Sequence, residues 1–319
     1  MPNKSLSRLC YTLVLITLGA CKSVPDTIEP QVTYSVQEKY LQALPSPFPP
    51  LSPIEKSYDW GKEYLIGLTL ATELDLYQAI TAFKRASILI PQENTERALE
   101  IQYNILLCYY VGHKYSDVIY TFNHSKLKNA TTDFPAMHDL LIILHDSYLQ
   151  EGNTEQANRI LSFLESQDPN AASQVTLSTA LSQANFPSID NYVASHPNDL
   201  AVKDFIDSYT LEKKSPGKAQ LLNAMVPGAG YLYVGQKQSA VTAFLLNGLF
   251  IAAATHFFQH RNIAAGVIFT SFEAGWYFGG IYGAGLEAKF YNERLYERKV
   301  NPLMNRQGLF PVLMLKYAF

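Results

Sequence analysis

Residues 219–236 read AQLLNAMVPGAGYLYVGQ and lead into two long apolar runs, 239–258 and 263–286. The first run carries no formal charge, and the second carries only Glu273. About 20 consecutive apolar residues are enough to cross the hydrocarbon core of a bilayer. The two runs therefore predict membrane-spanning helices joined by a short polar turn. A buried hairpin in a soluble protein is the alternative, and the scarcity of polar side chains favours the membrane.

Small and polar residues suggest how the two spans pack. Gly275, Gly279 and Gly283 recur at every fourth position of the second run, which lets another helix come close. Asn247 and Glu273 lie at similar distances from the turn, so we expect them at similar depth. A carboxyl group inside a membrane needs a partner, and Asn247 is our candidate. Two alternatives stay open: a glycine stripe that joins separate chains, and an ion pathway through Glu273.

The residues before the first run carry a glycine motif. Pro227, Gly228, Gly230, Tyr233 and Gly235 follow the spacing Pro-Gly-x-Gly-x-x-Tyr-x-Gly. This motif resembles the signature of small bacterial membrane domains of the TM2 type. The resemblance implies a membrane domain and little about mechanism. We expect 219–235 to form a half-helix that dips into the membrane or lies flat on it.

The start of the chain has the composition of an export signal. Lys4 and Arg8 precede a short apolar core, and Leu18-Gly19-Ala20-Cys21 resembles the lipobox of bacterial lipoproteins. The resemblance implies cleavage after residue 20 and lipidation of Cys21. It implies a protein of the bacterial cell envelope that faces the periplasm, with inner and outer membrane both open. A secretory signal with an incidental cysteine is the alternative.

Residues 21–58 are rich in proline and predict an extended linker between the lipid anchor and a folded domain. The net charge of −3 offers no basic footprint, so we expect no nucleic-acid partner. The three cysteines leave only Cys108 beyond the signal and the lipidation site, so no intramolecular disulfide is expected.

Residues 59–214 show a helical pattern with a period of 39. The marker positions are Ala79 and Phe83 in the first unit, Val118 and Phe122 in the second, and Ala157 and Leu161 in the third. The spacing resembles the tetratricopeptide repeat, although that family has a period of 34 and a glycine where this chain has His145. The resemblance implies pairs of antiparallel helices and a concave surface for a peptide or partner helix. An unrelated array of helices is the alternative.

The chain ends in two further patterns. Residues 287–299 predict an amphipathic helix, and 310–319 alternate in the manner of a strand. The alternation resembles the closing strand of outer-membrane barrels, but the long apolar runs before it have helical lengths.

Together these patterns predict an all-α protein in five parts. The parts are a signal peptide (1–20), a lipid-anchored linker (21–58), helical repeats (59–214), a glycine-rich membrane domain (215–300) and a tail (301–319). We find no catalytic, cofactor-binding or metal-ligating constellation, so we expect a scaffold that binds other envelope proteins and membrane lipid. A structural or channel-forming oligomer is the first alternative, and an enzyme is a remote one.

Overall fold

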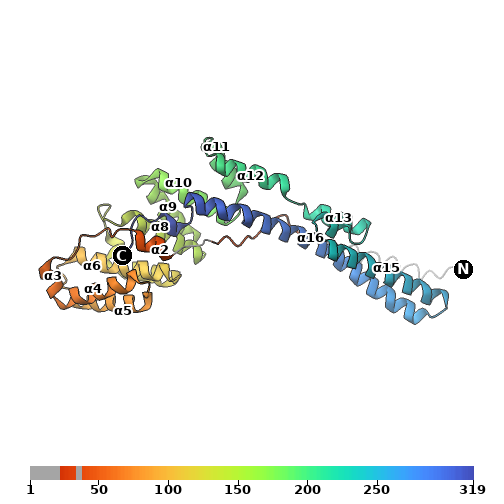
Figure 1. The fold of residues 1–319 in the computed structure, drawn as a ribbon, viewed down its shortest axis with the longest axis horizontal. Helices are drawn as coiled ribbons and strands as arrows, with labels where there is room; N and C mark the ends of the chain where they lie inside the picture. The colour runs from red at the N-terminus through yellow and green to blue at the C-terminus, as the bar shows by residue number, and fades with distance from the viewer. Residues whose placement is uncertain (1–21, 34–37) are drawn as a thin grey trace. The chain divides into compact units, whose positions relative to one another are not determined.

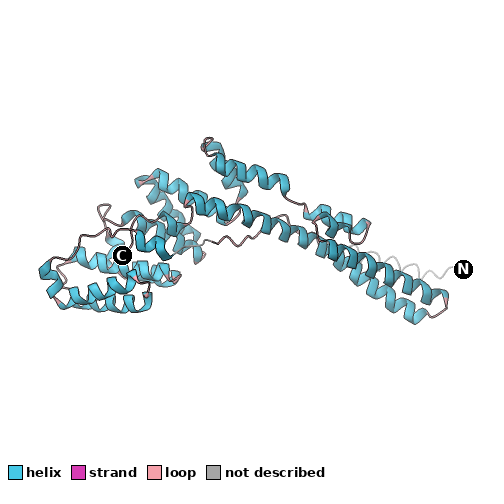
Figure 2. Cartoon of the chain, in the orientation of Figure 1, coloured by secondary structure: helices cyan, strands magenta, loops and turns pink. Residues whose placement is uncertain are grey.

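The computed structural model describes residues 22–33 and 38–319, and these residues form helices and loops without a strand. The all-α prediction is therefore confirmed for this part of the chain (Figure 2). The chain divides into two compact units. Figure 1 colours the chain by residue number. The first, which we call the hairpin unit after the predicted hairpin, consists of 22–32 and 196–300. The second, the array unit, consists of 33–195 and 301–319.

The array unit is a succession of short helices. Its helices are α2 (Glu38–Ala43), α3 (Pro53–Ser57), α4 (Asp59–Thr72), α5 (Leu76–Leu89), α6 (Thr95–Val111), α7 (Tyr115–Asn123), η1 (Lys126–Asn129), α8 (Met137–Gln150), α9 (Thr154–Gln167), α10 (Pro169–Ser182), α11 (Phe186–Ser195) and η2 (Pro311–Met314). Contacts run from α4 through α11 in chain order. Short turns between consecutive helices account for this order, because they keep sequence neighbours side by side.

A 39-residue spacing is visible in the backbone of the array unit. Leu74, His113 and Gly152 follow the first helix of successive pairs, and each adopts a positive φ (61°, 55° and 73°). A left-handed residue at this place ends one helix and turns the chain back along it. The second helices begin at the same spacing, with Asp75 and Asn153 capping α5 and α9 through their side chains.

The predicted packing positions agree with this spacing in part. Ala79, Val118 and Ala157 are all fully buried. Phe83 is fully buried as well, and a Cβ atom added to Gly67 would lie 2.6 Å from its ring, so this glycine permits a close helix crossing. Phe122, the marker position one period after Phe83, is only half-buried at the end of the short helix α7.

The hairpin unit contains α12 (Leu200–Glu212), α13 (Pro216–Met225), α14 (Ala229–Tyr233), α15 (Lys237–Gln259) and most of α16 (Ile263–Gln307). Helix α12 belongs here because Phe205 and Tyr209 stack edge-on against Tyr296 of α16. The boundary between the units is therefore near residue 195, earlier than the predicted boundary at 214.

Helices α15 and α16 meet at a three-residue turn. Phe250 and Phe257 of α15 contact Phe269 of α16, with ring centroids 6.4 and 5.2 Å apart, and the two helices lie side by side in Figure 1. By length and composition, α15 is the one helix of the described residues that could cross a membrane. Helix α16 continues through the predicted end of the second span at 286, because no proline or glycine follows before Pro302.

Three expectations about the connecting segments need correction. Residues 219–235 are divided between two short helices, α13 and α14, in place of one half-helix. Residues 311–314 form the 3-10 helix η2 in place of a strand, since Pro311 cannot donate to a strand ladder. The linker is not a free spacer: the amides of Glu29 and Gln31 donate to Glu293 and Glu297 of α16 (3.1 and 2.7 Å).

The spacing of the linker contacts follows from the similar lengths of two residues of extended chain and one turn of helix. Two residues of extended chain advance by about 6.6 Å, and four residues of helix advance by about 6.0 Å. Alternate amides of the extended segment therefore meet side chains four apart on a helix. The amide of Val24 is held in a similar way by Gln220 (3.2 Å), whose own amide group donates to Lys22 (3.1 Å).

Candidate functional site

The predicted site residues fall into different surroundings. Cys21, the expected lipidation site, lies outside the described residues. Asn247 is buried, but its amide donates to the carbonyl of Ala243 one turn earlier (2.6 Å). The expected hydrogen bond to Glu273 is not formed: within the described chain, Asn247 Oδ1 and Glu273 Oε2 are both buried atoms without a partner.

The glycine stripe is close-packed at only one of its three positions. A Cβ atom added to Gly283 would lie 2.4 Å from the hydroxyl of Tyr231, which belongs to α14. Cβ atoms at Gly275 and Gly279 would meet nothing within 4 Å. The prediction that the stripe packs against the first span is therefore wrong, because Gly283 meets α14 and the other two glycines meet nothing. Both glycines are exposed on the surface of α16.

The close packing lies instead at the Pro-Gly-x-Gly motif. Gly228 has φ +93°, and a Cβ atom there would lie 2.3 Å from the carbonyl oxygen of Ala240. A Cβ atom at Gly230 would lie 2.2 Å from the carbonyl oxygen of Ala219 and 2.8 Å from Ala284. The sequence motif signalled this packing, because only glycine fits where backbones approach so closely.

Asn223 completes this packing centre, and sequence reasoning missed it. Its buried side chain accepts a hydrogen bond from the amide of Gly228 (2.8 Å). Tyr277 of α16 donates to the carbonyl of Ala224 (2.5 Å). These bonds hold α13 against the start of α14 and against α16.

Beyond this packing centre, α15 and the first half of α16 expose large apolar side chains. They are Val241, Phe244, Leu245, Leu249, Ile251 and Phe258 on α15 and Ile263, Val267, Ile268, Phe272 and Trp276 on α16. The spacing of these residues covers several faces of each helix. An apolar surface of this extent is costly in water and marks contact with lipid or with another protein.

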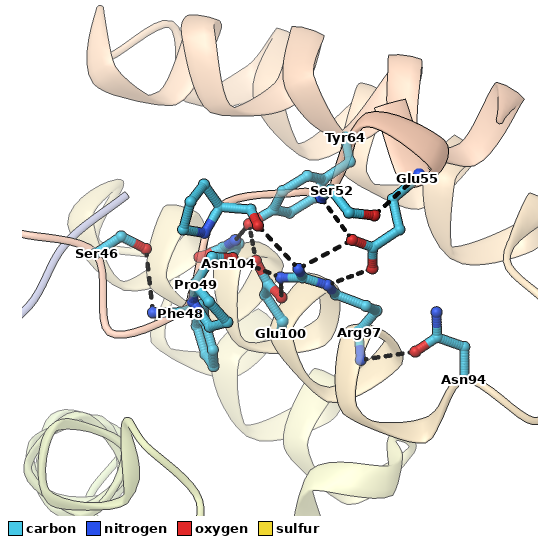
Figure 3. A network of polar contacts seen from close by, with 11 residues as sticks. Ser46, Phe48, Pro49, Ser52, Glu55, Tyr64, Asn94, Arg97, Glu100 and Asn104 are labelled. Atoms are coloured by element: carbon cyan, nitrogen blue, oxygen red, sulfur yellow. Dashed lines mark hydrogen bonds and ion pairs between the residues drawn. The ribbon is translucent and has the colours of Figure 1, made fainter. Parts of the chain in front are cut away.

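The array unit contains a polar network around Arg97 (Figure 3). The Arg97 guanidinium donates to Glu55 (2.9 Å) and Glu100 (2.6 Å), and also to the carbonyls of Pro49 (2.8 Å) and Pro50 (3.3 Å). It therefore ties α6 to α3 and to the proline-rich segment. Five donors in a rigid planar fork suit arginine to this role.

The pKa values of the two carboxyl groups in the network, Glu55 and Glu100, are shifted in opposite directions. Hydrogen bonds from the Arg97 side chain and the Ser52 backbone lower the pKa of Glu55 to about 2. Burial raises the pKa of Glu100, against the opposing effect of hydrogen bonds from Tyr64 and Arg97. Every charge in this cluster has a partner, so the network is suited to holding segments together.

Two cavities lie beside this network in the array unit. One, of about 420 Å³, is lined mainly by apolar side chains, including Leu51, Leu65 and Phe319. The other, of about 480 Å³, has Phe48, Arg97 and Phe134 among its lining. Volumes of this size can hold a small ligand or the side chains of a partner.

The tail of the chain occupies the array unit next to the first cavity. The fully buried carboxylate of Asp139 accepts the backbone amides of Lys316 (3.1 Å) and Tyr317 (2.8 Å). Tyr40 donates to the carbonyls of Leu313 and Leu315 (2.8 and 3.1 Å). Part of the array surface is thus covered by the chain itself.

The described residues hold neither a cluster of metal ligands nor an exposed thiol. No group of three or more histidine, cysteine or acidic side chains among the described residues could hold a metal ion. Cys108 is buried, and burial raises the pKa of its thiol, so it is a poor nucleophile. Comparisons with protein-family models, curated proteins and solved structures found no match to this chain.

Proposed function

We propose that this protein is a membrane-held scaffold of the bacterial cell envelope, which binds other proteins through its helical array. The observation that carries the proposal is the exposed apolar surface of α15 and the first half of α16. Helix α15 has 23 residues and is therefore about 35 Å long, enough to cross a hydrocarbon core of about 30 Å.

The array supplies the interaction surface in this proposal. Tyr77 and Ile88 of α5 are 84% and 82% exposed, which is unusual for large side chains on a well-packed array. Tyr77 and Ile88 are about three turns apart and therefore share one face of α5. Exposed apolar side chains that gather on one face can form a protein-binding surface. The 39-residue helical units and the resemblance to tetratricopeptide repeats support the same role.

Site-specific photocrosslinking in the native envelope tests this function. A crosslinker at Tyr77 or Ile88 should capture one defined protein, and Ile88→Asp should abolish the capture from Tyr77. A crosslinker at exposed Glu155 of α9 serves as the control position. Equal capture from all three positions, or none from any, would contradict the proposed surface.

Lipidation of Cys21 is part of the proposal and needs its own test. Metabolic labelling with an alkyne fatty acid should label the wild-type protein and leave Cys21→Ser unlabelled. Label retained on Cys21→Ser would exclude this residue as the acceptor.

A structural or channel-forming oligomer is the second candidate, and the exposed Gly275 and Gly279 favour it. Because a side chain at Gly279 has free space within one chain, Gly279→Ile should leave the fold intact. If the stripe joins chains, the same substitution should dissociate an oligomer in detergent. Size measured by native mass spectrometry distinguishes the two outcomes.

A further inference from the structure

The base of the hairpin carries lysines that no acidic side chain neutralises. Lys213, Lys214 and Lys218 precede or begin α13, and Lys237 begins α15. None of the four has an ion pair within the described residues, and the sequence contains no aspartate or glutamate between Glu212 and Glu273. We call these four lysines the basal lysines.

Three acidic groups near this base have other cations as partners. Glu212 pairs with Lys299 (2.9 Å), and Glu293 pairs with Lys289 (3.7 Å). Glu287 lies 3.9 Å from Arg294 and also accepts a hydrogen bond from Gln236. The charge of the basal lysines is therefore available to an external anion.

Two of the basal lysines are held in place by the fold. The ammonium groups of Lys214 and Lys218 both lie 5.2 Å from the centre of the Tyr233 ring. Buried Asn292 of α16 fixes the backbone of Lys214 from both sides, accepting from its amide and donating to its carbonyl (both 2.7 Å). Cation–π contacts of this kind orient a lysine while leaving its charge intact.

Apolar side chains continue the same face of α13. Lys218, Leu221 and Met225 are spaced three and four residues apart, so they share one face of the helix, and all three are exposed. A helix with a basic end and an exposed apolar face lies in the headgroup region of a bilayer. Tyrosines are also common at this depth, where Tyr233 would lie.

We propose that the basal lysines and the apolar face of α13 bind the phosphate groups of anionic phospholipids at one surface of the bilayer. This inference rests on the proposed insertion of the hairpin and adds the lipid class and the residues that recognise it. Each lysine near an anionic surface contributes roughly a fivefold gain in affinity. Three lysines together therefore give an effect large enough to measure.

Native mass spectrometry of the full chain in detergent tests the proposal. Phosphatidylglycerol and phosphatidylcholine with identical acyl chains are added in parallel, and bound lipid is counted. The wild-type protein should retain phosphatidylglycerol preferentially. The triple variant Lys213→Gln, Lys214→Gln, Lys218→Gln should lose that preference, and the corresponding triple arginine variant should keep it.

A matched control removes the same charge elsewhere. Lys84 also lies over a tyrosine ring, that of Tyr109 (5.3 Å), and Lys114 and Lys128 are exposed in the array unit. The triple glutamine variant at these three positions should retain the lipid preference. Circular dichroism spectra identical to wild type establish that each variant is folded.

Several results would overturn the inference. Equal retention of the two lipids by the wild-type protein would exclude recognition of anionic headgroups, while leaving membrane insertion itself intact. Displacement of the lipid by millimolar inorganic phosphate would show that the lysines bind free phosphate and not a lipid surface. A spin label on Leu249 that remained in water would contradict the insertion itself, and the inference with it.

Discussion

Helices α8 and α15 are both rich in apolar side chains, but they place them in opposite surroundings. Ten residues of the 14-residue α8 are buried, whereas four residues of the 23-residue α15 are buried. In the array, apolar faces turn toward neighbouring helices, which removes them from water. On α15 the apolar side chains turn outward, so only lipid or another protein could remove them from water. The comparison shows that hydrophobic content alone does not say where a helix belongs.

The largest expected effect on the free energy of unfolding comes from a substitution in the array unit. Phe83→Ala should lower the free energy of unfolding by about 3–5 kcal/mol, because it leaves a cavity against Gly67. Tyr77→Ala, in the same helix but 84% exposed, should change it by less than about 0.5 kcal/mol. Urea denaturation followed by circular dichroism compares the two. Equal effects would contradict the repeat packing.

Lowering the pH should reduce the free energy of unfolding of the array unit, because His145 is buried. Burial lowers the pKa of His145 to about 4, against about 6.5 in the unfolded chain. The unfolded state binds a proton between these values and the folded state does not, so stability falls as the pH drops from about 6.5 to about 4. The loss should be on the order of 3 kcal/mol.

Urea midpoints between pH 7 and pH 4.5 test this prediction, with His145→Leu as the reference. Glu100 and Asp146 have pKa values raised by burial and act in the opposite direction, so the variant is needed to isolate the histidine. A difference between the two proteins that does not change with pH would contradict the burial of a neutral His145.

The attachment of the tail to the array unit should weaken when Asp139 is replaced. Asp139→Ala removes the acceptor of two backbone amides, and it should cost about 2 kcal/mol. In this variant the rate of amide hydrogen exchange at residues 309–319 should increase, while the rate in α4 stays unchanged. Asp133→Ala, at an exposed position, is the control. Unchanged protection of the tail in Asp139→Ala would exclude this attachment.

The linker contacts give the smallest expected effect. Glu297→Ala frees the amide of Gln31 in an exposed setting, so it should cost about 0.5–1 kcal/mol. Limited proteolysis near residue 31 should become faster, whereas Glu155→Ala should leave the rate unchanged. Equal rates in all three proteins would indicate that the linker is detached in solution.

Local patterns explain which features could be predicted from the sequence. Burial of Ala79 and Phe83 follows from helical spacing within one pair of helices. The glycines at 228 and 230 were recognisable for the same reason. Their partners were not, because Ala240 and Ala284 approach them only in the folded chain.

Features that depend on distant partners could not be predicted. Asp139 meets the amides of Lys316 and Tyr317, and Asn292 meets the backbone of Lys214, although no pattern links these positions. The stripe at Gly275 and Gly279 has the spacing of a packing face, yet spacing does not say which neighbour it faces. Phe122 occupied the right register, but α7 ends at Asn123, one residue later.

The central claim, that α15 and the first half of α16 lie in lipid while α12 lies in water, can be measured with spin labels. A nitroxide is attached at Leu249, which is 62% exposed on α15, and at Leu211, which is 87% exposed on α12, in the full chain reconstituted in vesicles. Our account predicts that the label at 249 relaxes mainly by collision with oxygen, which concentrates in lipid. The label at 211 should relax mainly by collision with a water-soluble nickel complex. Contact of both labels with the nickel complex to the same extent would contradict the account.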